Sequence, residues 1–107
     1  MTDSQPIVDN PDAGRFELTV DGWTAFSEYH MLGRAIVFTH TEVPEELQGQ
    51  GVGSALARGV LAIARERGQE VVPLCPFIAD YIRSHPEYLD LVSEHNRRRL
   101  RLERGDD

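Results

Sequence analysis

The sequence predicts a small α/β domain, in which an antiparallel meander of strands precedes a parallel strand–helix–strand crossover. Three observations support this fold class. Residues 15–41 read as strands separated by tight turns. Residues 52–67 place apolar side chains at helical spacing between two β-type runs. The segment 48–53, which reads Q-G-Q-G-V-G, forms a glycine-rich junction between the strands and that helix.

The expected meander starts at position 15, where apolar and polar residues alternate through 15–20 as in a half-buried strand. Asp21-Gly22 then marks a two-residue hairpin, because a type I′ turn requires positive φ at both central residues. Residues 23–31 are the return strand. Residues 35–41 form a nearly continuous apolar run, which is typical of a central strand.

The crossover is predicted from the helical pattern and the short β-branched run that follows it. Gly68 and the cationic last turn before it end the helix. The strand expected at 70–74 runs parallel to the one at 35–41, because a helix joins them. Pro73 cannot donate a hydrogen bond to a neighbouring strand, so one side of this strand should lack a hydrogen-bonded neighbour there.

The chain of 107 residues indicates one domain. We expect a flexible lead-in over 1–14, partly a first strand, and the folded domain over 15–93, with short helices after the last strand. Residues 94–107 form a charged, Arg-rich tail, interpreted as a solvated helix end or disordered segment. The alternative is that its arginines form a patch for an anionic partner.

Composition excludes several functional classes. A net charge of −7 argues against general nucleic-acid binding. The chain contains no lysine, which excludes a Walker-type phosphate loop. Its single cysteine, Cys75, cannot form an internal disulfide and fits a reducing compartment. With no signal-peptide pattern and no apolar stretch of transmembrane length, we expect a cytoplasmic location and no membrane partner.

The glycine-rich junction has the physical properties of a phosphate-binding loop. Glycine tolerates positive φ and lets a ligand come close to the backbone. A helix that begins directly after such a loop presents unpaired N–H groups and the positive end of its dipole to an anion. The residues alone therefore indicate an anion site between the strand at 35–41 and the helix that follows.

The junction resembles the acetyl-CoA pyrophosphate loop of the GNAT superfamily of N-acetyltransferases. The resemblance extends over 15–92 and is greatest to a subfamily of very short, single-domain GNAT-like proteins. The matching segments are Val43-Pro44, the pattern Gln48-x-x-Gly51-x-Gly53, Ala55-Leu56, the C-P-F segment Cys75-Pro76-Phe77, Tyr81-Ile82 and His85-Pro86-Glu87-Tyr88. A GNAT-like fold implies a mixed sheet whose two parallel strands splay apart.

The resemblance implies that acetyl-CoA is the co-substrate and that acetyl is transferred to an amine. The acceptor, a small molecule or a protein, is unknown. No metal is implied, and we expect a monomer or weak homodimer. The residues expected to hold acetyl-CoA are Thr41 and Val43 at the pantetheine arm, Gln48, Gly49, Gln50, Gly51, Val52, Gly53 and Ser54 at the pyrophosphate, and Tyr81 near the thioester.

Three residues are candidates for the chemistry. Cys75 follows the second parallel strand, where it could accept the acetyl group or only lie near the thioester; isolated cysteines also serve as buried apolar residues. His40 and Glu42 share one face of their strand, opposite Thr41, and either could act as a base. The alternatives are a structural histidine for His40, a solvated acid at the end of the strand for Glu42, and core packing for Tyr81.

Two other functions remain open at the level of sequence. A non-catalytic acyl-CoA-binding or sensor module would keep the loop but lack an acceptor pocket. A partner-dependent subunit would use the arginines of residues 94–107. The chain is shorter than ordinary GNAT enzymes, which predicts an acceptor site that is shallow, supplied by a partner or made for a large substrate.

Overall fold

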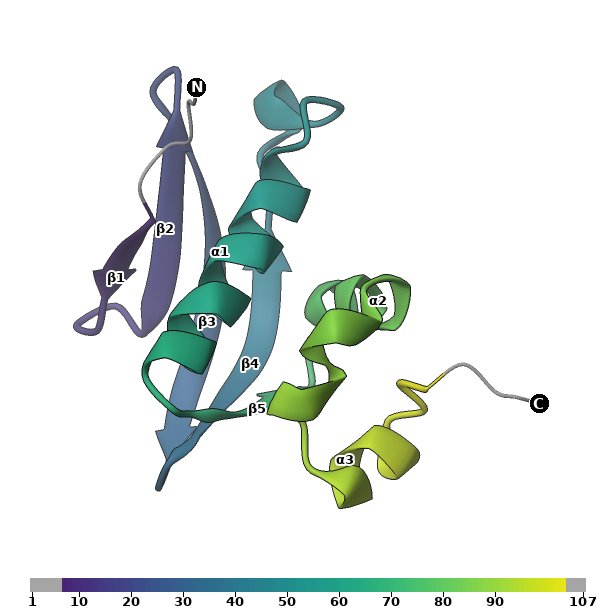
Figure 1. Ribbon diagram of the computed structural model, residues 1–107. Coiled ribbons are helices and arrows are strands. Elements are labelled where there is room, and N and C mark those ends of the chain that lie inside the picture. The colour runs from purple at the N-terminus through teal and green to yellow at the C-terminus, as the bar shows by residue number, and fades with distance from the viewer. Residues whose placement is uncertain (1–6, 104–107) are drawn as a thin grey trace.

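The computed structural model describes residues 7–103, which form a five-stranded sheet with helices packed on one face (Figure 1). Neighbouring strands follow one another in chain order, and every pairing is antiparallel except the parallel pair β4–β5. The strands are β1 (Val8–Asn10), β2 (Arg15–Val20), β3 (Trp23–Leu32), β4 (Ala35–Glu42) and β5 (Glu70–Pro73). This mixed α/β sheet confirms the predicted fold class.

The hairpin between β2 and β3 turns at Asp21 and Gly22, whose φ values are 53° and 83°. Both central residues are left-handed, as the type I′ prediction requires. Apolar residues alternate along these strands and are fully or almost fully buried on the helix-covered face, for example Phe16 and Leu18. The meander therefore contributes one face to the core.

A β-bulge interrupts the pairing of β3 with β4. Glu28 lies opposite His40 and Tyr29 lies opposite Phe38, which leaves Thr39 as an extra residue in β4. An extra residue reverses the alternation of the strand from that point onward. Thr41 therefore faces the helices, as Phe38 does, whereas simple alternation from Phe38 would give that place to His40.

Helix α1 (Val52–Glu66) crosses the sheet and buries Val52, Leu56, Ala57, Val60, Leu61 and Ala64. It begins after Gly51, and the chain leaves it through Gly68, which has a φ of 68°. A short 3₁₀ turn, η1 (Glu45–Leu47), connects β4 to the glycine-rich junction and buries Leu47. The helix thus starts where the sequence places the end of the loop.

Strand β5 pairs with β4 only as far as Phe38 and Pro73. The Cys75 N–H then donates to the Phe38 carbonyl at 2.9 Å, and helix α2 (Pro76–Ser84) begins at the next residue. From Thr39 to Glu42, β4 continues without a strand on that side in the described part of the chain. This opening between β4 and the start of α2 is the splay that the resemblance implies.

After α2, the chain forms a 3₁₀ helix, η2 (Pro86–Leu91), and helix α3 (Glu94–Arg99). Leu102 beyond α3 is fully buried in the core, and Arg83 of α2 donates to the carbonyls of Leu100 and Arg101. The described part of the expected Arg-rich tail therefore packs against the domain, because an apolar side chain anchors it. Residues 1–6 of the expected lead-in and residues 104–107 lie outside the described part.

Within residues 7–103, no helix has both the length and the apolar character needed to cross a membrane.

Candidate functional site

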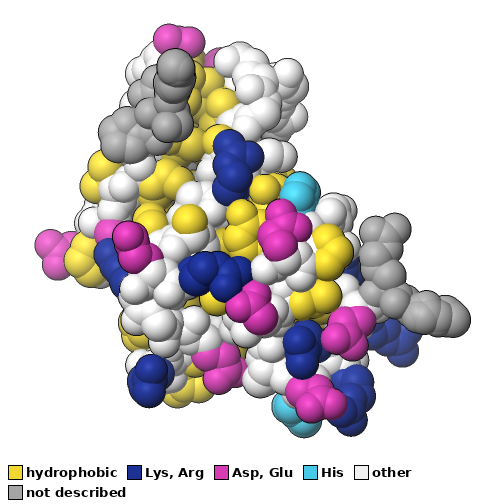
Figure 2. All heavy atoms as spheres, viewed as in Figure 1, with side chains coloured by type: hydrophobic (Ala, Val, Ile, Leu, Met, Phe, Trp, Pro, Cys, Tyr) yellow, Lys and Arg dark blue, Asp and Glu magenta, His cyan; other side chains and the backbone are white. Residues whose placement is uncertain are grey.

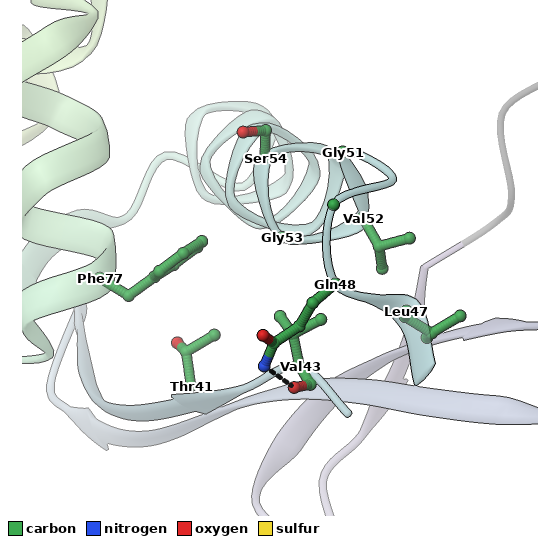
Figure 3. Close-up of a pocket in the computed structure, with 10 residues that line it drawn as sticks. Thr41, Val43, Leu47, Gln48, Gly51, Val52, Gly53, Ser54 and Phe77 are labelled. Carbon is green, nitrogen blue, oxygen red and sulfur yellow. Dashed lines mark hydrogen bonds between the residues drawn. The ribbon is translucent and has the colours of Figure 1, made fainter. Parts of the chain in front are cut away.

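A pocket of about 440 Å³ lies where the end of β4, the glycine-rich junction and the starts of α1 and α2 meet (Figure 3). In the close-up, Thr41 and Phe77 lie on one side of this pocket and Val43 and Gln48 on the other, below the first turn of α1. The lining residues are Thr41, Val43, Leu47, Gln48, Gly49, Gly51, Val52, Gly53, Ser54 and Phe77. The lining set carries no charged side chain.

Each glycine of the junction has a distinct geometric role. Gly49 and Gly51 have φ values of 82° and 78°, in the left-handed region that glycine occupies without steric cost. Gly53 lies inside α1, and a Cβ built on it would come within 2.7 Å of Cζ of Phe77. Two glycines thus allow the turn of the loop, and the third lets the Phe77 ring approach the helix.

The first turn of α1 supplies the electrostatic character of the pocket. Its N-cap is Gly51, and no side chain caps the free N–H groups. Figure 2 shows that positive and negative side chains are interspersed over the helix-covered side, with no large patch of one sign. The positive potential at this pocket therefore comes from the backbone N–H groups and the helix dipole, not from charged side chains of the lining.

Gln48 and Gln50 support the loop through side-chain contacts with its backbone. The side-chain Nε2 of Gln48 donates to the Val43 carbonyl at 3.2 Å. The Nε2 of Gln50 donates to the Glu46 carbonyl at 3.0 Å and is not part of the pocket lining. The two glutamines tie the junction to the end of β4 and to η1.

Cys75 lies directly behind the Thr41 wall of the pocket. The side chain is 2% exposed, and its thiol donates to Thr41 Oγ1 at 3.2 Å. Thr41 Oγ1 is also 3.0 Å from the hydroxyl of Ser27, a fully buried residue of β3. The thiol therefore reaches the pocket through Thr41, at the point where β4 and β5 separate.

His40 and Glu42 point to the other face of the sheet. The Nε2 of His40 is 2.9 Å from a carboxylate oxygen of Glu42, and both side chains are more than half exposed. The ring of Phe26 lies 6.3 Å from that of His40, on the same face. The structure thus separates the two candidate bases from the pocket by the thickness of β4.

Tyr81 lies apart from the pocket. It is 9% exposed, and its ring stacks on His85 with centroids 4.0 Å apart, in the packing of α2 against η2. Sequence reasoning missed Leu47 and Phe77 as lining residues and Ser27 as the partner of Thr41. The inward position of Ser27 could have been predicted from the sequence, because alternation along the strand places it on the same face as Ala25 and Tyr29.

The groups whose pKa values shift lie outside the pocket lining. Burial, together with the hydrogen bond donated to Asp9, raises the pKa of Tyr29 to about 12. The pKa of Asp90 is lowered because its carboxylate accepts two hydrogen bonds from Arg65. Both shifts report contacts that join elements of the fold.

Among residues 7–103, no three His, Cys, Asp or Glu side chains gather into a group able to hold a metal ion.

A mixed sheet that opens between its parallel strands, with a glycine loop, a helix N-terminus and a pocket at the opening, defines the class of mixed α/β domain to which this chain belongs. The model of the GCN5-related N-acetyl-transferase family matches residues 15–91. The chain belongs to this family. The match contains β2 to β5, α1, α2 and every residue of the pocket lining.

Individual relatives agree with this assignment. Protein NATD1 from human, mouse and chicken is 32% identical over 65 residues, which span 58% of this chain and 58–59% of those proteins. The NMR solution structure of a "GCN5-like putative N-acetyltransferase" from Staphylococcus aureus superposes with a TM-score of 0.64 at 27% identity. That superposition covers 83% of this chain and 88% of the other.

Proposed function

We propose that this protein is an acetyltransferase that uses acetyl-CoA as donor and transfers acetyl to an amine. The observation that carries the proposal is the pocket between the unpaired end of β4 and the first turn of α1, with Cys75 next to its Thr41 wall. Membership of the GCN5-related family and the likeness to the S. aureus structure support the same class of activity.

In this proposal the pyrophosphate of acetyl-CoA binds the N–H groups of the loop and of the first turn of α1. The pantetheine arm lies along the unpaired edge of β4 from Thr41 to Val43, where an extended amide chain can take the place of a strand. The thioester then comes to lie near Thr41, at the opening. Phe77 flanks the arm on the side of α2.

The first route to product is direct transfer. An amine enters from the open face of the sheet and attacks the thioester carbonyl, the bond to the CoA sulfur breaks, the amide forms, and the proton that the nitrogen loses passes to the departing CoA sulfur. His40 or Glu42, which lie on that face, would take the proton from the incoming ammonium. The positioning of the two reactants provides much of the rate enhancement.

The second route passes through Cys75. Its sulfur attacks the thioester carbonyl, the thiol proton passes to the departing CoA sulfur, and acetyl-Cys75 and free CoA result. A neutral amine then attacks acetyl-Cys75, the new carbon–sulfur bond breaks, and an amine proton returns to the cysteine sulfur. The hydrogen bond from Cys75 to Thr41 places the sulfur at the opening for this exchange.

Two measurements on the purified protein test the proposal. CoA release should rise above background with at least one member of a panel of primary amines, and the Gly51→Glu variant should lose it. Incubation with acetyl-CoA alone, followed by intact-mass analysis, should add one acetyl group to Cys75 if the covalent route operates. Turnover with no adduct on Cys75 would leave direct transfer as the route.

An acyl-CoA sensor is the second candidate function. It is favoured by the near-complete burial of Cys75 and by the position of His40 and Glu42, which lie on the face of β4 opposite the pocket lining. Tight binding of acetyl-CoA without amine-dependent CoA release would support the sensor and contradict the acetyltransferase.

A further inference from the structure

One row of polar side chains crosses the sheet in the middle of an otherwise apolar face. It runs from Ser27 on β3 to Thr41 on β4 and on to Cys75, just after β5. The oxygen atoms of Ser27 and Thr41 are 3.0 Å apart, and the sulfur lies 3.2 Å from Thr41 Oγ1. The row ends at the opening between the parallel strands, next to the pocket.

The burial of Ser27 shows that this row is not explained by packing alone. Ser27 is fully buried, and it is the polar residue among the buried side chains of the described chain. Ala25, two residues earlier on the same face, is also fully buried, so this face accepts a small side chain without a hydroxyl. A buried hydroxyl is tolerated when it is hydrogen-bonded, and Thr41 provides that partner.

The β-bulge at Thr39 is what brings Thr41 into the row. Because the extra residue reverses the alternation of β4, Thr41 stands opposite Ser27 on the inner face. On the other side, the backbone of Cys75 is held by its N–H bond to the Phe38 carbonyl. Both the acceptor and the donor of the thiol hydrogen bond are therefore fixed by the sheet.

We propose that Thr41, backed by Ser27, is a positioning residue that holds the Cys75 sulfur toward the thioester bound at the opening. Either hydroxyl can be the donor in the Ser27–Thr41 contact. While Cys75 carries its proton, the thiol donates to Thr41, and Thr41 donates to Ser27. When the proton leaves, both hydroxyls rotate, so that Ser27 donates to Thr41 and Thr41 donates to the sulfur. No heavy atom has to move.

This inference rests on the covalent route of the proposed function, because it needs a thioester at the opening and a Cys75 sulfur that attacks it. It assigns a function to the hydroxyl groups of Ser27 and Thr41, which do not themselves react in either transfer route. It also gives the bulge a function, because the bulge turns the Thr41 side chain from the exposed face of the sheet to the helix-covered face.

The hydrogen bond can be measured in the unliganded protein. Cys75 is the single cysteine of the chain, so the infrared S–H stretching band reports this thiol alone. Thr41→Val removes the hydroxyl at constant shape, so the thiol loses its acceptor and the band should move to higher frequency. Thr41→Ser keeps a hydroxyl, so the band should stay at the wild-type frequency. Thr39→Val is the matched control, since the hydrogen bond of the Thr39 hydroxyl within residues 7–103 goes to the Glu28 carbonyl, at 3.4 Å, and not to Cys75. An unchanged band in Thr41→Val would overturn the proposal.

The positioning role is tested by kinetics on the same variants. Thr41→Val should lower kcat for CoA release about tenfold, and Ser27→Ala about threefold, as expected for the loss of one hydrogen bond or its support. The KM for acetyl-CoA should stay within about twofold, because the backbone of the loop holds the cofactor. Thr41→Ser should recover kcat, and an unaltered kcat in Thr41→Val would contradict the role.

Failure of the proposed function gives a different result. A wild-type protein that does not bind acetyl-CoA in a calorimetric titration would overturn the proposed function and the positioning role with it, whatever the infrared band shows. Binding and turnover that are equal in wild type and Thr41→Val would overturn the positioning role alone.

Discussion

At Gly51 the backbone has a φ of 78°, and a Cβ added there would meet no atom within 4 Å. Gly51→Glu therefore adds strain and a carboxylate at the place proposed for the pyrophosphate, where like charges repel. We expect the affinity for acetyl-CoA to fall by at least about a hundredfold in calorimetry, a loss of roughly 2.7 kcal/mol or more.

Gly33 provides the control for this change. It has a φ of 61° and equally open surroundings, but it lies in the turn that precedes β4, at the end of the strand away from the pocket. Gly33→Glu adds the same strain and charge and should bind acetyl-CoA as wild type does. Equal affinities of the two variants would refute the placement of the pyrophosphate.

The contact between Gly53 and Phe77 makes a second prediction. A methyl group at position 53 would lie 2.7 Å from Cζ of Phe77, so Gly53→Ala must push the ring aside. Because Phe77 lines the pocket, acetyl-CoA binding should weaken about five- to tenfold, which corresponds to roughly 1 kcal/mol. Phe77→Leu should restore binding in the Gly53→Ala background, as a double-mutant cycle would show. Additive losses would contradict the contact.

For individual residues, the sequence predicts the positions of the loop glycines better than it predicts the surroundings of the candidate catalytic residues. The glycine spacing identifies the residues that gather at the pocket, because backbone conformation there depends on local residue type. The Ser27–Thr41–Cys75 row could not be predicted, because it depends on a bulge that only the pairing of β3 with β4 creates. His40 and Glu42 do share a face, as alternation predicts, but their position relative to the pocket also depends on that bulge.

At the scale of elements, the ion pair of Arg65 with Asp90 joins α1 to η2. Arg65 donates two hydrogen bonds to the Asp90 carboxylate, at 2.7 and 3.0 Å, and these lower the pKa of Asp90 below its usual range. A lowered pKa in the folded state means that the pair stabilises the fold above the unfolded-state pKa. The stabilisation is lost as the pH falls through the lowered value.

Asp90→Asn should therefore lower the free energy of unfolding at pH 7 by about 0.5–1 kcal/mol, since both side chains are substantially exposed. The difference from wild type should shrink below about pH 3.8 in urea titrations. In an Arg65→Gln background the same substitution should have almost no effect. A gap that is as large in acid as at pH 7, with no decrease as the pH falls, would show that the pair is not its cause.

Most elements could be predicted because their signals are local. Short stretches of sequence predict the turn at Asp21-Gly22, the helix after Gly51 and the end of that helix at Gly68. The structure confirms all three. The end of the chain could not be predicted in this way. Its arginines suggested a solvated segment, whereas the position of Leu102 in the core depends on packing against residues distant in sequence.

At the scale of the whole molecule, Leu102 makes the C-terminal segment part of the fold. Its side chain is fully buried, so Leu102→Ala should leave a cavity and lower the free energy of unfolding by about 2–4 kcal/mol. Leu32→Ala is the matched control, because Leu32 is 72% exposed and should cost less than about 0.5 kcal/mol. Equal urea midpoints for the two variants would show that the segment does not pack as described.

If acetyl-CoA binds in the opening between β4 and α2, its pyrophosphate lies at the first turn of α1. This placement can be tested by titrating ¹⁵N-labelled protein with acetyl-CoA and following the amide chemical shifts. We expect the largest changes within residues 41–54 and at Phe77, while the β2–β3 hairpin at Asp21 and Gly22 stays unchanged. Absence of change at millimolar acetyl-CoA, or changes that gather away from the pocket, would contradict it.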